Sequence, residues 1–323
     1  MRRPFRGFLL TLFALIAGAT AAAAQTYPNR PIRVVVPYPP GGAVDLIGRL
    51  YAQALSARLG QPVVIENKPG SGGNLASDTV AKAAPDGYTL LHGSDNVFMS
   101  NPHIYGKMPF DPFKDLVPVS SLSSNQLVLA VHPSVPANSL RDFVELARAT
   151  KPSLFYASIG NGSQHHLAME MLKQHVGIDL IHVPYRGGAA AALGLVAGEV
   201  AAMFGGGSLV PTVYAGKVRG LASTGTVRNP ATPELPTIAE IYPGYEALIW
   251  QGLFVPAGTP QPIIDRLRAE LQGVLAQPEF AKRLADAGAG EPYFTTLEEF
   301  AARIKADYEK YGKLIRSIGV KVE

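Results

Sequence analysis

The chain has 323 residues, of which 47% are apolar, enough for two domains of ordinary size with sizeable cores. It contains no cysteine, which excludes disulfides, thiol catalysis and thiolate metal sites. The formal net charge of +4 at pH 7 does not indicate the strongly basic surface that nucleic-acid binding requires, so no nucleic-acid partner is expected.

Residues 1–24 have the order of a cleavable signal peptide. Three arginines precede a short apolar run over 8–17, and small alanines ending at Ala24 offer a cleavage point. A membrane anchor is the alternative, but the apolar stretch is only marginally long enough and no basic stop-transfer cluster follows it. The paired arginines leave ordinary and twin-arginine export open. Cleavage would leave 26 basic and 25 acidic residues, a net charge of +1, in a free periplasmic protein.

Beyond the leader, short β-branched runs alternate with segments of helical spacing. Strands are expected at 32–36, 63–66 and 88–91, and helices at 43–59 and 74–83, the second capped by Asn74. A second unit follows, with strands at 127–131, 154–157, 181–183, 200–204 and 220–223 and helices at 139–150, 163–176 and 188–197. This alternation is typical of an α/β fold with parallel sheets covered by helices.

The C-terminal part differs, because a strand at 248–255 is followed by three helices without strands between them. They are expected at 260–275, 278–287 and 296–317, the last with capping-box spacing between Thr296 and Glu299. We expect these helices to pack on the first unit. Lobe 1 would then comprise 25–122 and 247–323, and lobe 2 would comprise 123–246. Two crossings would form a hinge beside a ligand cleft, although the periodicity leaves a single fused sheet open.

Ligands of open α/β sheets bind beyond the carboxyl ends of the strands, so the segment after the first strand is a candidate site. It reads Tyr38-Pro39-Pro40-Gly41-Gly42-Ala43 and leads into a helix. Glycine permits close approach of a ligand to the backbone, and the free N–H groups of a helix start suit a carboxylate. Asp45 lies in the first turn, where it can cap the helix. A plain turn into a helix is the alternative.

A similar segment follows the strand at 154–157. Small residues and hydroxyls, namely Ser158, Gly160, Gly162 and Ser163, precede a helix whose first turn contains His166. Its N–H groups could face the first segment across the cleft, and a capped helix with ordinary histidines is the alternative. Other strands also end in polar residues: Ser94 and Asn96, Tyr185, and Ser223 and Thr224. This shared character favours a cleft for a polar ligand.

The sequence gives weaker support for a catalytic site than for a binding cleft. The sequence has no G-x-S-x-G motif, and Ser163 and His166 have no apparent acidic partner. The histidines at 165, 166 and 175 lack H-E-x-x-H spacing, so we expect no metal and no cofactor. A hydrolase that uses Ser163 or a histidine remains the weakest of three hypotheses. The others are a transport receptor and a binding module for signalling.

Short, distinct motifs are spread along essentially the whole mature chain. They are 27–28 with 31–32, 37–42 with Asp45, 66–70, 84–88, 101–102, 160–163 with 166–167, 182–187, 235–240 and 250–253. In number and order they resemble the Bug/TctC family, the extracytoplasmic solute receptors of tripartite tricarboxylate transporters. The resemblance implies a two-lobed type II periplasmic-binding-protein fold that docks transiently on membrane transporter subunits. A hinged receptor of this kind suits operation as a monomer. It also implies carboxylate capture by the loops at 38–43 and 158–163, largely through backbone N–H groups and water, with His166 and Tyr185 nearby.

One segment departs from the family pattern. Where the family often has an acidic residue followed by an amide or small polar residue, this chain has Gly205-Gly206-Gly207-Ser208. We therefore expect a roomier or less acidic pocket that suits a longer or bulkier acid, with the Ser208 hydroxyl as a substitute contact.

Overall fold

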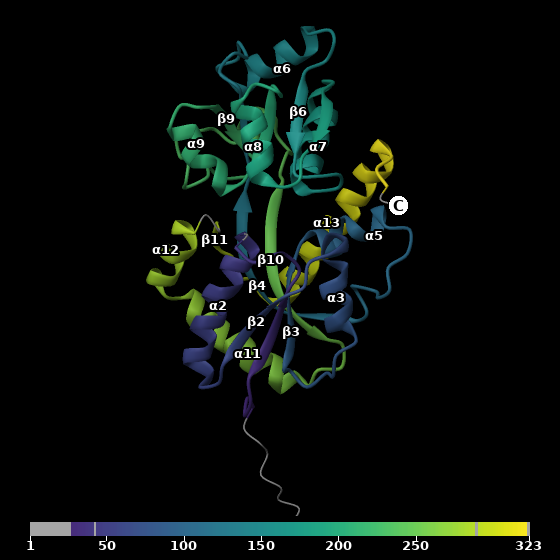
Figure 1. The fold of residues 1–323 in the computed structure, drawn as a ribbon, viewed down its shortest axis with the longest axis vertical. Coiled ribbons are helices and arrows are strands. Elements are labelled where there is room, and N and C mark those ends of the chain that lie inside the picture. Colours follow the sequence, from purple (N-terminus) through teal and green to yellow (C-terminus); the bar gives the residue numbers. More distant parts are fainter. Residues whose placement is uncertain (1–26, 42, 288–289, 322–323) are drawn as a thin grey trace, which may run out of the picture.

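The computed structural model describes residues 27–41, 43–287 and 290–321. The expected signal peptide and Gly42 lie outside them. Figure 1 shows two lobes, one above the other, joined by the long strand β10 and its neighbours. Each lobe has its own sheet, with six and five strands respectively. The expected two-lobed α/β architecture is confirmed, and the fused sheet is excluded. Across the described residues, no helix combines the length and apolar character needed to cross a membrane.

The sheet of lobe 1 has the order β11-β4-β10-β3-β1-β2. Its strands are β1 (Ile32–Val36), β2 (Val63–Asn67), β3 (Thr89–Ser94), β4 (Leu116–Gln126), β10 (Leu248–Pro256) and β11 (Glu291–Pro292). Strand β1 pairs in parallel with β2 and β3, whereas β10 runs antiparallel to β3 and β4. The predicted parallel core therefore carries an antiparallel extension, which includes the return strand.

Helices cover both faces of this sheet, because alternate strand residues point to opposite sides. One face holds α2 (Ala43–Leu59), α11 (Gln261–Leu275) and α12 (Pro278–Asp286), and the other holds α3 (Asn74–Ala81), α4 (Asn96–Met99) and α13 (Leu297–Ile318). Ile32 and Val34 pack in the cluster with α2 and α11, and Val35 packs with α3 and α13. Full burial of such a side chain contributes roughly 1.5–3 kcal/mol to folding.

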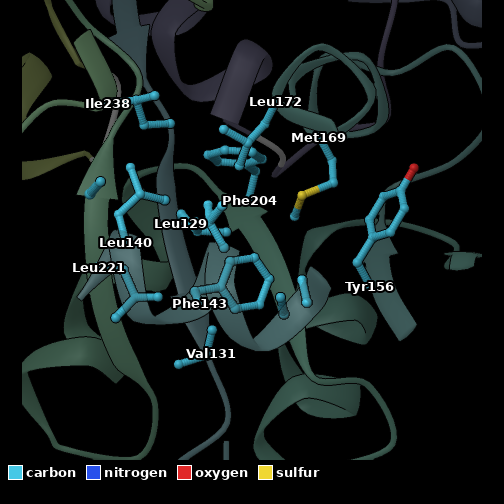
Figure 2. Close-up of a cluster of buried hydrophobic side chains, with 14 of the residues drawn as sticks. Leu129, Val131, Leu140, Phe143, Tyr156, Met169, Leu172, Phe204, Leu221 and Ile238 are labelled. Atoms are coloured by element: carbon cyan, nitrogen blue, oxygen red, sulfur yellow. The ribbon is translucent and has the colours of Figure 1, made fainter. Parts of the chain in front are cut away.

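The sheet of lobe 2 has the order β7-β6-β8-β5-β9. Its strands are β5 (Val128–Val131), β6 (Phe155–Ser158), β7 (Ile181–Pro184), β8 (Ala202–Gly205) and β9 (Arg219–Ser223), and its longer helices are α6 (Leu140–Ala149), α7 (Gln164–Val176) and α8 (Gly188–Val196). Two short helices, α9 (Val210–Tyr214) and α10 (Ile238–Ile241), complete it. Figure 2 shows one core face of this lobe, where Leu129 and Phe204 from the sheet meet Phe143 of α6 and Leu172 of α7.

Two adjacent crossings join the lobes. Strand β4 stays in the lobe 1 sheet as far as Gln126, beyond the expected boundary at residue 122, and β5 starts one residue after Leu127. The Leu127 N–H donates to Thr224 Oγ1 at 2.8 Å, and the Leu127 carbonyl accepts the Thr224 N–H at 2.9 Å. The Ala247 N–H then donates to the Thr224 carbonyl at 3.0 Å, just before β10. Thr224 therefore ties the outgoing and returning chains together.

The C-terminal helix contacts both lobes. Tyr311 and Ile315 of α13 join Leu167 of α7 and Ile104 of α5 (Asn101–Ile104) in one buried apolar cluster. Figure 1 shows the yellow α13 rising from the lower lobe towards α7. On the same helix, Asp307 accepts the Trp250 Nε1–H at 2.8 Å, which places the single tryptophan in the core beside the hinge.

The helix starts show which capping signals were reliable. Ser139, Ser163 and Thr296 each cap a helix as predicted, and Thr296 forms the capping box with Glu299. The predicted cap at Asn74 is wrong. The left-handed Gly73, with φ +95°, occupies the cap position and Asn74 is the first helical residue. The Asn74 side chain is buried and accepts a hydrogen bond from Asn101 Nδ2 at 2.7 Å instead.

Candidate functional site

The loop after β1 is anchored by the hydroxyl of Tyr38. It lies 3.0 Å from Ser94 Oγ and donates to Asn96 Oδ1 at 3.2 Å, while Ser94 also donates to Asn96 Oδ1 at 2.5 Å. Burial raises the pKa of Tyr38 to about 12, so the phenol is neutral at pH 7 and can both donate and accept. Three predicted site residues are thus brought together at the carboxyl ends of β1 and β3. Pro39 and Pro40 lie beside them, exposed.

Asp45 locks the same loop onto α2. Its carboxylate accepts the Gly41 N–H at 2.9 Å, Arg49 Nε at 2.9 Å and Asn67 Nδ2 at 2.8 Å. Burial opposes ionisation, but these donors lower the pKa of Asp45 below its usual value. The φ of +85° at Gly41 requires glycine at this turn. Because the Gly41 N–H already donates to Asp45, it is not available to a ligand. Ala43 begins α2, and Gly42 lies outside the described residues.

The loop after β6 is tightened by two serines. Ser158 Oγ accepts the Gly160 N–H at 3.0 Å and lies 2.6 Å from His182 Nε2. Ser163 Oγ donates to the Gly160 carbonyl at 2.7 Å and accepts the His166 N–H at 3.3 Å as the cap of α7. The turn is therefore held in shape before any ligand arrives.

His166 contributes to this loop as a hydrogen-bond acceptor. Its Nδ1 accepts the Gly162 N–H at 3.1 Å, so the neutral ring carries its proton on Nε2. The ring stacks on His182 with centroids 3.9 Å apart. Burial, followed by the nearby His182 and Lys173, lowers the pKa of His166 to about 3. His166 is thus uncharged at neutral pH and offers no positive charge to an anion.

These contacts change which backbone donors are available. The N–H groups of Gly41, Gly160 and Gly162 are all engaged within the protein. Among the residues that the structure describes, the N–H groups of Asn161, Gln164 and His165 have no acceptor. The last two belong to the first turn of the 13-residue helix α7, where the helix dipole also favours an anion. The available donors are therefore the loop amide of Asn161 and the helix-start amides of Gln164 and His165, whereas the three glycine amides are engaged.

The two loops meet at the end of β3. Gln164 Nε2 donates to Asp95 Oδ2 at 3.0 Å and to the Leu248 carbonyl at 2.8 Å, across the junction of the lobes. Asp95 lies between Ser94 and Asn96, the two partners of Tyr38. It is buried, and this burial raises its pKa to about 7. The segment 94–96 therefore contacts both loops.

Other predicted residues lie elsewhere. The Tyr185 hydroxyl donates to Glu199 at 2.9 Å, with its ring against Gly194 of α8, and so turns away from the 158–163 loop. The Thr224 hydroxyl accepts the Leu127 N–H at the hinge, and Ser223 is fully buried. Ser208 belongs to the short helix η2 (Gly207–Leu209), and its side chain lies outside the description. The prediction from the resemblance that Tyr185 stands near the loops holds for its backbone, which donates to the Ser158 carbonyl at 2.9 Å.

The site residues predicted from the sequence did not include Gln164, Asp95 or His182, although all three lie next to predicted residues or within a quoted motif. Gln164 follows the cap Ser163, and Asp95 stands between two predicted residues. Buried polar side chains need partners, and those partners come from distant segments that a single sequence does not reveal. Within the described part of the chain, no three or more metal-binding side chains are grouped to hold an ion.

Two α/β lobes joined by adjacent crossings, with convergent polar loops at their strand ends, define a two-lobed solute-binding protein. The family model described as "Tripartite tricarboxylate transporter family receptor" matches residues 47–320. The chain belongs to this family. Protein BugT of Bordetella pertussis is 32% identical over 319 residues, which cover 98% of each chain.

Solved structures agree with this assignment. The structure of Rhodopseudomonas palustris Rpa4515 with adipate matches with a TM-score of 0.81 at 33% identity, over 91% of this chain and 99% of that one. MatC from the same organism, with bound malate, matches with a TM-score of 0.76 at 32% identity, over 90% of this chain and 100% of that one. The expected type II periplasmic-binding-protein fold is confirmed.

Proposed function

We propose that this chain is an exported receptor that binds a small organic acid between its lobes and delivers it to a membrane transporter. The observation that carries the proposal is the pair of unengaged helix amides of Gln164 and His165 beside the junction of the two loops. Such amides bind a carboxylate through hydrogen bonds and the helix dipole. Two structurally similar family members hold the dicarboxylates adipate and malate.

The donor set supports binding without turnover. The Ser163 hydroxyl is fixed between the Gly160 carbonyl and the His166 N–H, and the His166 Nδ1 is occupied by the Gly162 N–H. Ser158 does contact His182, but its side chain is fully buried. A nucleophile must reach its substrate, so neither serine is placed for hydrolysis.

The proposal also covers export, docking on the transporter and closure of the lobes. The leader would be removed near Ala24, which releases a monomer into the periplasm. The membrane transporter subunits would recognise the liganded receptor through transient docking. Binding energy gained from contacts to both lobes would favour the closed state, which is how a ligand shifts such an equilibrium.

A thermal-shift screen of residues 25–323 tests the proposal. We expect one class among mono-, di- and tricarboxylates and aromatic acids to stabilise the protein by about 2.7 kcal/mol at 100 times its dissociation constant. Gly162→Leu should abolish the shift, because a Cβ at Gly162 would lie 2.8 Å from Ile104 Cδ1 and displace the loop. Gly177→Leu is the matched control, since Gly177 has a similar φ of +66° with open space around it. No stabilisation by any acid would contradict the proposal.

A further inference from the structure

A hollow lies between the lobes. It is on the opposite side of the hinge from the contact between α7 and α13. It is formed by the end of β4, the loop after β9, and β11, and its volume is about 120 Å³. A single water needs roughly a tenth of that volume, so the hollow has room for a group of several atoms. Its lining includes Asn125, Gln126, Thr226, Asn229 and Glu291.

Sheet order places the glycine segment between this hollow and the loop after β6. In lobe 2 the strands run β6, β8, β5, β9, so the end of β8 lies between the ends of β6 and β9. Gly206 directly follows β8, and a Cβ built on it would find Asn125 Nδ2 as its nearest neighbour, 3.9 Å away. A longer side chain at 206 would occupy space beside Asn125, which glycine leaves unfilled.

The neighbouring Gly205 has a different reason to be glycine. A Cβ there would lie 2.4 Å from Leu209 Cδ2, so Gly205 is needed for packing inside lobe 2. Gly206 meets no such constraint, because its nearest would-be contact is at ordinary van der Waals distance. Packing therefore leaves room for a side chain at 206 but not at 205.

The lining of the hollow is mixed, with Val227, Pro230 and Leu248 beside its polar residues, and it carries little charge. The Gln126 side chain donates to the Val227 carbonyl at 3.0 Å and accepts the Gly225 N–H at 3.2 Å, which makes a firm wall. Asn229 Oδ1 accepts the Ala231 N–H at 2.9 Å. Glu291 is the charged residue among the described lining residues, and none of them is lysine or arginine. A second carboxylate would meet an acid without a cation to neutralise it.

We propose that this hollow is the distal subsite of the receptor and takes the neutral, amide- or hydroxyl-bearing end of a long monocarboxylic acid. This inference rests on the proposed function, in which the first carboxylate binds at the start of α7. The start of β5, which Gln126 of the hollow precedes by two residues, lies two strand spacings of about 4.8 Å each from the end of β6. An acid of about eight carbons spans that distance, whereas butyrate does not.

Isothermal titration calorimetry with four eight-carbon acids and butyrate tests the inference. The acids are octanoate, 8-hydroxyoctanoate, octanedioate and octanedioate monoamide. We expect the hydroxy acid and the monoamide to bind about tenfold more tightly than octanedioate or octanoate. Thr226→Trp should fill the hollow and remove the advantage of these two acids over butyrate. Lys217→Trp, exposed on the same lobe outside the hollow, should preserve it.

A charge reversal gives the sharper test. Glu291→Lys should invert the preference, so that octanedioate binds about tenfold more tightly than its monoamide. Glu309→Lys, an exposed position on α13, makes the same change in net charge and should leave the preference unchanged. Octanedioate binding as tightly as the monoamide, with no effect of Glu291→Lys, would overturn the subsite and leave the proposed function intact. Absence of binding by all five acids would overturn the subsite, and an acid of another class that stabilises the protein in the thermal-shift screen would leave the proposed function intact.

Discussion

The two flanks of the hinge differ in how the lobes meet. On the α7 flank, Leu167, Ile104 and Tyr311 bury apolar surface between the lobes, and Gln164 adds hydrogen bonds across the junction. On the β9 flank, a mixed lining of polar and apolar residues with the single charge of Glu291 surrounds a hollow. Separating buried apolar contacts costs free energy, whereas widening a hollow breaks few contacts. We therefore expect the lobes to pivot on the α7 flank and to open on the β9 flank.

Leu167→Ala should have the largest effect on this comparison. Leu167 is fully buried in the cluster that joins α7 to α13. Removing its side chain should lower the free energy of unfolding by about 2–5 kcal/mol, through lost burial and the cavity left behind. Urea denaturation measures the change. Leu193→Ala on α8, where the side chain is 69% exposed, should change it by less than about 0.5 kcal/mol. Equal effects of the two variants would show that the α7 flank does not hold the lobes.

The buried Asp95 should make stability depend on pH. Burial raises its pKa from 3.8 to about 7 in the folded protein. The folded state therefore holds the proton more tightly, so this contribution is present below about pH 4 and is lost as the pH rises through 7. Asp95→Asn should remove a slope worth roughly 1–4 kcal/mol between pH 4 and 8. Denaturation midpoints of the two proteins across that range measure it.

The control for this pH effect is Asp142→Asn. Hydrogen bonds from the Asn138 N–H and at Ser139 lower the pKa of Asp142, so its contribution is lost only at acid pH. The control should leave the slope between pH 5 and 8 unchanged. His92 and His165 act with the opposite sign, because burial lowers the pKa of each to about 4. Their contribution is lost as the pH falls from 6.5 towards 4. A fall in stability with rising pH that persists in Asp95→Asn would refute the assignment to Asp95.

Gln164→Leu should weaken the same flank by a smaller amount. The variant removes the donor to Asp95 and to the Leu248 carbonyl, leaving buried acceptors without that partner. The expected loss is about 1–3 kcal/mol in the free energy of unfolding. Gln174→Leu is the matched control. Gln174 also reaches from α7 to lobe 1, where it donates to Ser317 of α13 at 2.7 Å, but its side chain is exposed. A loss in the control as large as in Gln164→Leu would mean that burial of the contact is irrelevant.

The smallest expected effect separates packing from backbone strain. Gly162→Ala and Gly177→Ala both place a side chain on a left-handed residue, with φ +72° and +66°. That strain costs about 1 kcal/mol in each. Only at Gly162 does the new Cβ also crowd Ile104. We therefore expect Gly162→Ala to lower the free energy of unfolding by about 1 kcal/mol more than Gly177→Ala does. Thermal melts of the two variants would show equal stability if the loop can shift freely away from Ile104.

The sequence predicted the fold well because local signals agreed with it. Strand runs such as 32–36 and helix caps such as Ser139 depend on neighbouring residues, and both are observed where expected. Strand β4 was not predicted, because its residues 120–126 are rich in serine and lack an apolar pattern. Their strand conformation comes from pairing with β10, which is distant in the sequence.

The site was predicted less completely than the fold. Loop positions follow from strand order, so the segments at 38–43 and 158–163 could be named in advance. Which N–H groups are available depends on partners such as Asp45 and the ring of His166. Those partners are set by rotamers and turn geometry, which a pattern of small residues does not determine. The sequence therefore located the loops, and the structure assigns the donors within them.

The route of the chain through the two lobes has a consequence for biogenesis. Lobe 2 is built from one continuous stretch between β5 and Ala247, whereas the lobe 1 sheet needs β10 and the lobe junction needs α13. If the N-terminus leaves an export channel first, lobe 2 can complete its core while β4 still waits for its antiparallel neighbour. Lobe 1 must then remain open until the last helix emerges. The junction with α7 is thus the final step of maturation, and a chain cut short before Leu297 would expose the apolar surface of Leu167 to chaperones and proteases.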